Sequence, residues 1–148
     1  MITVEPIHSI GSSYEFLRAT RTRTANGMLI LPATRYIDDT ASALGLEKAT
    51  PSATPGLVCV KADDDEDLLV GDEKSTFSSC VGRLLYLASY RHDIQWVLGD
   101  LCSLLQKPTC LAWRKLKHLT RYLIGTRDMC LNFPVEPAMR EISVYVDA

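Results

Sequence analysis

Apolar residues recur at helical spacing in three stretches of the second half of the chain, 75–90, 93–106 and 110–124. Residues three and four positions apart share one face of a helix, so each stretch predicts a helix with a single apolar side. The three apolar stripes are Phe77, Cys80, Val81, Leu84, Leu85 and Ala88, then Ile94, Val97, Leu98, Leu101, Leu104 and Leu105, then Ala112, Leu116, Leu119 and Leu123. Together they predict a three-helix bundle.

Residues at the helix ends and outside the stripes refine this prediction. Ser75 or Thr76 is the candidate N-cap of the first helix, and Thr109 that of the third. Gly82 costs about 1 kcal/mol relative to Ala inside a helix, so it indicates a close backbone approach by a neighbour. Trp96 falls outside the stripe of its helix and therefore needs a partner.

The first half of the chain has an extended pattern followed by a helical one. Residues 14–31 form two short extended runs around Asn26-Gly27, a dipeptide typical of a β-hairpin turn. Residues 34–46 carry apolar side chains at helical spacing, and Gly45 is positioned to end that helix. We therefore expect a hairpin followed by a short helix.

Two further segments complete the predicted organisation. Residues 47–74 contain Pro51, Pro55 and the acidic run DDDED, without apolar periodicity, and are expected to be a linker or long surface loop. Residues 142–148, ISVYVDA, alternate as a strand does. The fold class is thus α+β and mostly helical: a hairpin, a short helix, an acidic loop, a three-helix bundle and one C-terminal strand.

Charge is distributed unevenly along the 148 residues, although the net charge is only −2. Residues 36–73 carry ten acidic and two basic side chains, whereas 74–127 carry nine basic and two acidic ones. The basic side chains of the last helix lie opposite its apolar stripe. Such a face attracts phosphate backbones, although an ordinary solvated helix surface is an equally common explanation.

Other features restrict the class of protein. The five cysteines form no Cys-x-x-Cys pair, so neither a zinc site nor a disulfide framework is indicated. No signal peptide precedes the first element, and no apolar run approaches the roughly 18 residues of a membrane span. We expect an intracellular protein, in the cytoplasm or nucleus, that does not bind a membrane.

The four letters Tyr36-Ile37-Asp38-Asp39 match the signature that holds catalytic magnesium in reverse transcriptases. Two-metal catalysis needs carboxylates that bracket ions about 4 Å apart, including one from another strand. Neither flank of this match reads as a strand, and only Glu5 and Glu15 are acidic upstream of it. Asp38 and Asp39 are instead expected in the first turn of a helix, where negative charge is favourable. No catalytic residue is assigned.

Three segments resemble, in order, copia-type LTR-retrotransposon Pol polyproteins. FSSCVGRLLYLASYRHDI (77–94) is similar to the stretch written Y-R-x-L-V-G-x-L-L-Y-L-x-x-x-R-P-D-I, with Arg91 and Asp93 in register. KPTCLAWRKLKHLTRYLIGT (107–126) resembles N-P-T-x-x-H-W-x-x-x-K-R-I-L-R-Y-L-K-G-T, with Tyr122 and Thr126 in register. Residues 10–46 are similar to the segment of the family polyproteins that lies before these two motifs. The resemblance therefore covers nearly the whole chain.

The resemblance implies a position in the family enzyme downstream of its catalytic aspartates. Residues 1–46 would hold the primer-grip hairpin, with Phe16, Leu17 and Gly27 as grip residues. Residues 75–127 would be the thumb and connection, after the 47–74 linker. Residues 140–148 would open a truncated ribonuclease H domain, with Asp147 as the first carboxylate of an incomplete metal site. The intact enzyme uses Mg²⁺, whereas this fragment is expected to need no cofactor.

The implied function is to grip primer–template during RNA-directed DNA synthesis, next to palm and ribonuclease H parts that this chain lacks. By itself the chain is expected to be inactive as an enzyme. Its partner would be an RNA–DNA or DNA duplex, held by phosphate contacts that do not read sequence. The residues expected to make these contacts are Arg21, Arg23, Arg83, Arg91, Arg114, Lys115, Lys117 and Arg121.

Departures from the family pattern keep two alternatives open. Arg18 replaces the glycine after Phe16-Leu17, and Pro32 stands where a glutamine is usual. One alternative is an inactive retroelement relic, since the primer grip is the most altered part. The other is a non-enzymatic helical interaction module, in which Trp96 and the small face of Gly82 and Ser89 dock another protein.

Overall fold

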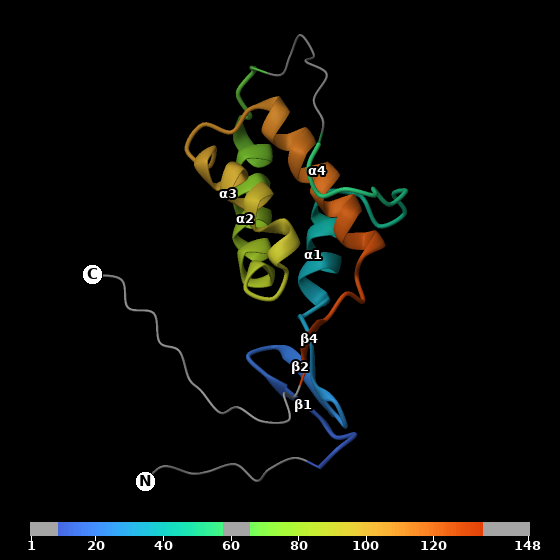
Figure 1. The fold of residues 1–148 in the computed structure, drawn as a ribbon. Coiled ribbons are helices and arrows are strands. Elements are labelled where there is room, and N and C mark those ends of the chain that lie inside the picture. The colour runs from blue at the N-terminus through green and yellow to red at the C-terminus, as the bar shows by residue number, and fades with distance from the viewer. Residues whose placement is uncertain (1–8, 58–65, 135–148) are drawn as a thin grey trace, which may run out of the picture.

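The computed structural model describes residues 9–57 and 66–134 of the chain, as a bundle of helices with a small sheet at one end (Figure 1). The helices are α1 (Arg35–Ala43), α2 (Gly71–Ala88), α3 (Gln95–Ser103) and α4 (Cys110–Gly125), with a 3₁₀ turn, η1 (His92–Ile94), before α3. The fold is α+β, as the sequence predicts.

The core lies among the helices and consists mostly of the predicted stripes, although Leu85 of the first stripe is 46% exposed and Leu87, which was not in it, is buried. Phe77 and Leu84 of α2, Leu98 of α3, and Leu116 and Leu119 of α4 are completely or almost completely buried. Ile37 joins the same cluster from α1, so this short helix packs onto the bundle. The periodicity of the sequence therefore identified the apolar sides of all the bundle helices.

The helix ends fit the prediction at two places and correct it at a third. The Thr109 hydroxyl caps α4 by accepting a hydrogen bond from the Ala112 amide at 3.3 Å. Gly45, at φ +66°, follows the end of α1 in the left-handed conformation that glycine adopts easily. The helix α2, however, begins at Gly71, so Ser75 and Thr76 lie within it and cap nothing.

The early start of α2 also shortens the expected 47–74 loop. Asp72 and Glu73 occupy the first turn of α2, where carboxylates interact favourably with the helix dipole. A Cβ added to Gly82 would meet nothing within 4 Å, so the close backbone approach expected there is wrong.

The sheet has four antiparallel strands in the order β1-β2-β3-β4: β1 (Ser13–Phe16), β2 (Ala19–Thr24), β3 (Gly27–Leu31) and β4 (Leu131–Pro134). The predicted hairpin is β2 and β3, joined through Ala25 and Asn26. The first predicted run is divided into β1 and β2, which pair with each other. The strand β4, which returns from the end of α4 to pair with β3, was not predicted.

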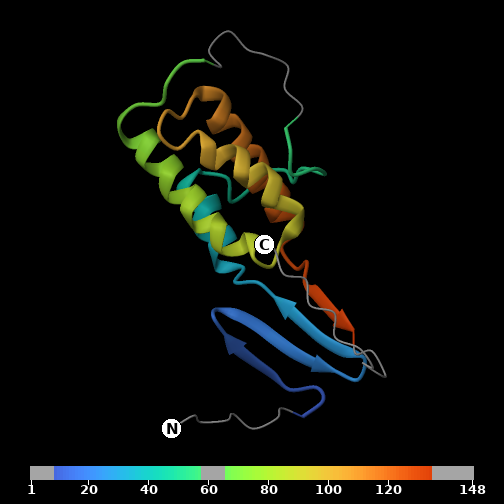
Figure 2. The same cartoon turned by 60° about the vertical axis from the view of Figure 1, so that its left-hand side comes forward.

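Gly27 lies where β4 approaches β3 most closely. A Cβ at this position, with φ +150°, would overlap the carbonyl of Phe133. Figure 2 shows the sheet projecting from the lower end of the bundle, with the helices clear of both of its faces. Within the described ranges, no helix is both long and apolar enough to cross a membrane. The strand expected at 142–148, with Asp147, lies outside the described residues.

Candidate nucleic-acid interface

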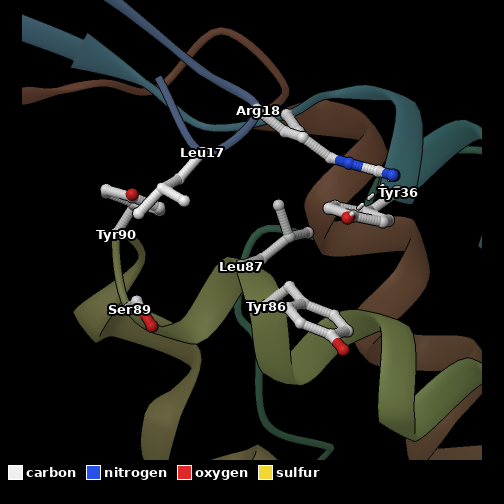
Figure 3. Close-up of a pocket in the computed structure, with 8 residues that line it drawn as sticks. Leu17, Arg18, Tyr36, Tyr86, Leu87, Ser89 and Tyr90 are labelled. Carbon is white, nitrogen blue, oxygen red and sulfur yellow. Dashed lines mark hydrogen bonds between the residues drawn. The ribbon is translucent and has the colours of Figure 1, made fainter.

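The β1–β2 turn lies over a groove at the junction of sheet and bundle (Figure 3). Its volume is about 380 Å³, and aromatic and apolar side chains dominate its lining, together with Arg18. The rings of Tyr36 and Tyr86 stack with centroids 5.6 Å apart and an angle of 17° between their planes. The lining residues are Leu17, Arg18, Ala33, Tyr36, Tyr86, Leu87, Ser89 and Tyr90.

The turn that covers this groove is strained. Leu17 and Arg18 have φ values of +51° and +63°, a region that residues with a Cβ disfavour by about 1–2 kcal/mol. Arg18 stands where the family pattern has glycine, which adopts this conformation freely. The Arg18 guanidinium donates a hydrogen bond to the Tyr36 hydroxyl at 3.3 Å and lies 6.0 Å from that ring's centroid. These contacts offset part of the strain.

Strand register assigns the two predicted hairpin arginines to one face of the sheet. Residues directly opposite each other on neighbouring strands share a face, and side chains alternate along each strand. Arg21 is opposite Ile30, and Arg23 is opposite Met28. Glu15, which is opposite Thr20, lies on the other face. We call the face that carries Arg21 and Arg23 the arginine face.

Aromatic side chains share the arginine face with these cations. Phe133 is opposite Met28, so it lies in the same row as Arg23. Phe16 is opposite Ala19, two residues before Arg21, and the Arg21 guanidinium lies 4.5 Å from the Phe16 ring centroid. The sheet therefore combines positive charge with aromatic rings on one side.

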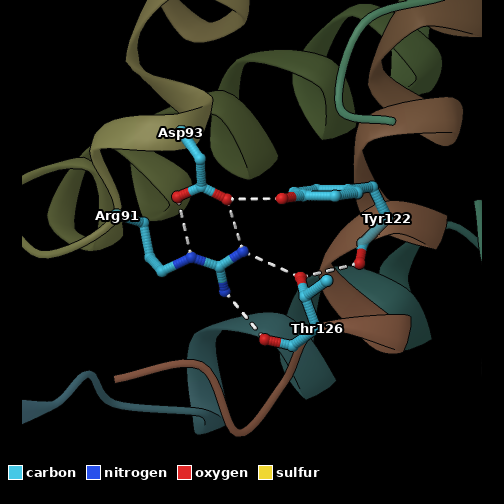
Figure 4. Close-up of polar contacts among 4 residues, drawn as sticks. All are labelled: Arg91, Asp93, Tyr122 and Thr126. Atoms are coloured by element: carbon cyan, nitrogen blue, oxygen red, sulfur yellow. Dashed lines mark hydrogen bonds and ion pairs between the residues drawn. The ribbon is translucent and has the colours of Figure 1, made fainter. Parts of the chain in front are cut away.

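Arg91 is the clearest departure from the predicted set of phosphate-binding residues. Its residue surface is only 2% exposed, so it lies in the interior and the expectation that it contacts phosphate is wrong. Two of its nitrogens donate hydrogen bonds to the Asp93 carboxylate at 2.9 and 2.7 Å (Figure 4). The other bonds reach the Thr126 carbonyl at 3.0 Å and the Thr126 hydroxyl at 2.7 Å.

Tyr122 completes this polar cluster, in which Arg91 and Tyr122 are buried and the Asp93 side chain is 27% exposed. Its hydroxyl donates to Asp93 at 2.7 Å, so the cluster joins the start of η1 to the end of α4 (Figure 4). Burial alone would raise the pKa of Asp93, but the hydrogen bonds from Arg91 and Tyr122 outweigh it and lower that pKa. The pKa of Tyr122 is raised by burial and by its bond to Asp93. All four cluster residues, Arg91, Asp93, Tyr122 and Thr126, match the two family motifs.

The cations of α4 also bind within the chain. Arg121 donates from Nε to the Thr50 carbonyl at 2.6 Å, and the Lys115 ammonium lies 2.7 Å from Asp100. His118 bonds to Ser52 and to the Thr54 carbonyl, both at 3.0 Å. Lys117 lies 5.2 Å from the Trp113 ring centroid, and Arg114 also has a partner. This basic face thus fixes residues 50–54 against the helix.

The remaining predicted residues lie on the surface of α1 and α2. Arg83 is partly exposed and donates to the Asp39 carbonyl at 3.2 Å. Asp38, within the first turn of α1 as expected, pairs with Arg127 at 2.7 Å. Asp39 lies 3.8 Å from Arg35, one turn away. Among the described residues, no group of three potential metal ligands occurs.

Sequence reasoning missed the groove tyrosines and Phe133. Tyr86 lies outside the predicted apolar stripe of its helix and is exposed, and an aromatic residue at such a position was a usable signal. Phe133 had no such signal, because it belongs to a strand that pairs with a distant partner.

Comparison with known proteins gives relatives but no family model or solved structure, since neither of these matches the chain significantly. The retrovirus-related Pol polyprotein from transposon RE2 of Arabidopsis thaliana is 32% identical over 76% of this chain. The uncharacterized mitochondrial protein AtMg00810 of the same plant is 28% identical over 79% of the chain. The putative transposon Ty5-1 protein YCL074W of Saccharomyces cerevisiae is 28% identical over 94%.

The matched segment is only part of each relative. It corresponds to 48% of the mitochondrial protein, 45% of the yeast protein and 8% of the RE2 polyprotein. The similarity extends over most of this chain and is not limited to the two helical motifs. The chain is therefore similar, over most of its length, to one segment of retrotransposon Pol polyproteins.

Proposed function

We propose that the chain grips a primer–template duplex, as the primer-grip, thumb and connection part of a copia-type reverse transcriptase. It would support RNA-directed DNA synthesis by a catalytic palm and would contribute no catalytic residue from its described part. The family resemblance of the hairpin and of the two helical motifs supports this role. The names of the relatives support only the broader statement that the chain is related to a Pol polyprotein.

The observation that carries the proposal is the separation of charge on the sheet. Arg21 and Arg23 share one face, and Glu15 is on the other. A duplex approaching the arginine face would meet two guanidinium groups, of which Arg21 also lies over the Phe16 ring and Arg23 also has a partner within the chain. Such contacts fix the position of a duplex but do not read its sequence.

The test is a titration of a blunt RNA–DNA hybrid by fluorescence anisotropy at several salt concentrations. Each phosphate contact adds about 0.9 to the slope of log affinity against log salt, because counterions are released. The Arg21→Gln and Arg23→Gln variants are each expected to lower the slope by about that amount. Binding that does not change between about 50 and 200 mM salt would contradict the proposal.

Two control variants separate the sheet from other cations. Arg35→Gln removes an exposed arginine of α1 that pairs with Asp39, and it should leave the slope unchanged. Arg121→Gln removes the bond to Thr50. This change is expected to lower the free energy of unfolding and to leave the slope almost unchanged.

A second candidate function is docking of another protein, which Trp96 favours. Its side chain is 80% exposed on α3, and an exposed tryptophan is typical of a binding surface. Sedimentation of the purified chain without nucleic acid would detect self-association. Self-association that Trp96→Ala abolishes would support this candidate, whereas a monomer that changes only on adding hybrid would support the grip.

A further inference from the structure

The aromatic residues of the arginine face are more exposed than a duplex grip requires. Phe16 is 47% exposed and Phe133 is 52% exposed, on the two edge strands β1 and β4. Bases in a duplex are stacked on each other, so their faces are not available to a protein ring. Unpaired bases, in contrast, stack on aromatic side chains and on arginine planes.

Spacing on the sheet suits an extended strand rather than a single base. Phe16 and Phe133 lie on strands three positions apart and in rows four residues apart, which corresponds to about 14 Å across the sheet and about 13 Å along it. Arg21 and Arg23 lie on β2, between these two edges. A chain crossing the face from edge to edge would meet a ring, two cations and a second ring.

The Arg21 side chain also extends the stacking surface at the β1 edge. Its guanidinium lies 4.5 Å from the Phe16 ring centroid, so ring and cation already form a pair. An arginine plane can stack a base on one side while its charge attracts phosphate. Met28 lies on the same face between the edges and is half-buried, so it adds apolar contact, whereas Ile30 beside it is buried.

The opposite face lacks this combination. Ser13, Thr22, Leu29 and Asn132 form one row across it, and Glu15 lies in the next row. The two faces of the sheet therefore differ in both charge and aromatic content. Charge complementarity favours a polyanion on the arginine face only.

We infer that the arginine face binds the unpaired strand of a primer–template, with Phe16 and Phe133 stacking bases and Arg21 and Arg23 contacting phosphates. This inference rests on the proposed function, because it assigns a single-stranded part of the same ligand to the sheet. Binding by stacking is tolerant of sequence, since every base offers a flat face.

The test compares three labelled probes by anisotropy: a blunt RNA–DNA hybrid, the same hybrid with a single-stranded extension of about eight nucleotides, and that strand alone. The extension is expected to tighten binding of the unmodified chain about fivefold or more. A Phe16→Ala, Phe133→Ala double variant is expected to lose this gain, which is read as the ratio of its affinities for the extended and the blunt hybrid, so that any loss of duplex binding at Phe16 cancels.

Asn132→Ala is the matched control, because Asn132 precedes Phe133 on β4 but lies on the opposite face. It should keep the gain from the extension. The inference is overturned if the extension adds nothing, or if its gain persists in the double variant. If the chain binds the lone strand in a way that depends on both phenylalanines, but does not bind the blunt hybrid, the stacking surface is supported and the duplex grip is overturned. Absence of binding to all three probes would overturn both.

Discussion

The bundle and the sheet are held together in different ways. The bundle buries an apolar core from four helices, and the polar cluster around the buried Arg91 ties the start of η1 to the end of α4. The sheet exposes large apolar side chains such as Phe16 and Phe133, and its β1–β2 turn is strained. Stability is therefore concentrated in the bundle, and surface available for binding is concentrated in the sheet.

The family motifs divide along the same line. The motif residues of α2, η1 and α4 include the polar cluster, so their chemistry serves the fold. The departure at Arg18 lies in the turn between β1 and β2, where a glycine would relieve strain. A polar motif residue is thus not necessarily a ligand-binding residue, as Arg91 demonstrates.

Truncating one phenylalanine in each region should give the largest difference between them. Phe77 is fully buried, so Phe77→Ala is expected to lower the free energy of unfolding by about 3–5 kcal/mol. Phe133→Ala should cost about 1 kcal/mol or less, because half of that side chain is already in water. Urea unfolding measures both, and equal losses would show that the sheet contributes as much as the bundle.

Removing the cation of the polar cluster should have the next largest effect. Arg91→Met removes the donor to the Thr126 carbonyl and leaves Asp93 with the Tyr122 hydroxyl but without its cation, which is expected to cost about 2–4 kcal/mol. Arg35→Met breaks an arginine–aspartate pair whose arginine side chain is 70% exposed, and should cost about 0.5 kcal/mol or less. Similar losses in urea unfolding would contradict a structural role for the cluster.

Relieving the turn should stabilise the sheet. Arg18→Gly removes the left-handed strain and the contacts with Tyr36, whereas Arg18→Ala removes the contacts and keeps the strain. The glycine variant is expected to be about 1 kcal/mol more stable than the alanine variant. Thermal unfolding of the two variants side by side gives this difference. A glycine variant no more stable than the alanine variant would mean that the turn is not strained.

Acid should weaken the bundle through Asp93. The pKa of Asp93 is lower in the folded chain than its usual 3.8, so the unfolded chain binds the proton first as pH falls. The contribution is complete above about pH 4 and is lost as pH falls through the lowered folded pKa. Urea unfolding across this range should show the advantage of the unmodified chain over Asp93→Asn shrinking. A constant difference between the two would contradict the linkage.

Local sequence patterns were sufficient for the helices. Apolar spacing identified the buried sides of α2, α3 and α4, and Thr109 marked the start of α4 correctly. These features depend on residues three or four positions apart, which the sequence displays directly. The hairpin of β2 and β3 was likewise visible from Asn26-Gly27, although the turn lies one residue earlier, at Ala25 and Asn26, and Gly27 begins β3.

Features that depend on distant partners were not visible. The strand β4 ends at Pro134, which disfavours a strand, and it forms because β3 offers an open edge. The β1–β2 turn escaped notice because neither Leu17 nor Arg18 is a typical turn residue. Arg91 was expected on the surface because most arginines are exposed, and only the positions of Asp93 and Thr126 make its burial possible.

Hydrogen exchange of the chain, alone and with the extended RNA–DNA hybrid, tests the division between bundle and sheet most directly. In the free chain, the amides of α2 and α4 should exchange most slowly and those of the sheet faster. Adding the hybrid should slow exchange in β2 and β4 and leave α3 unchanged. The account would be contradicted if the hybrid slowed amide exchange only in α3 and α4. It would also be contradicted if saturating hybrid slowed amide exchange in no part of the chain.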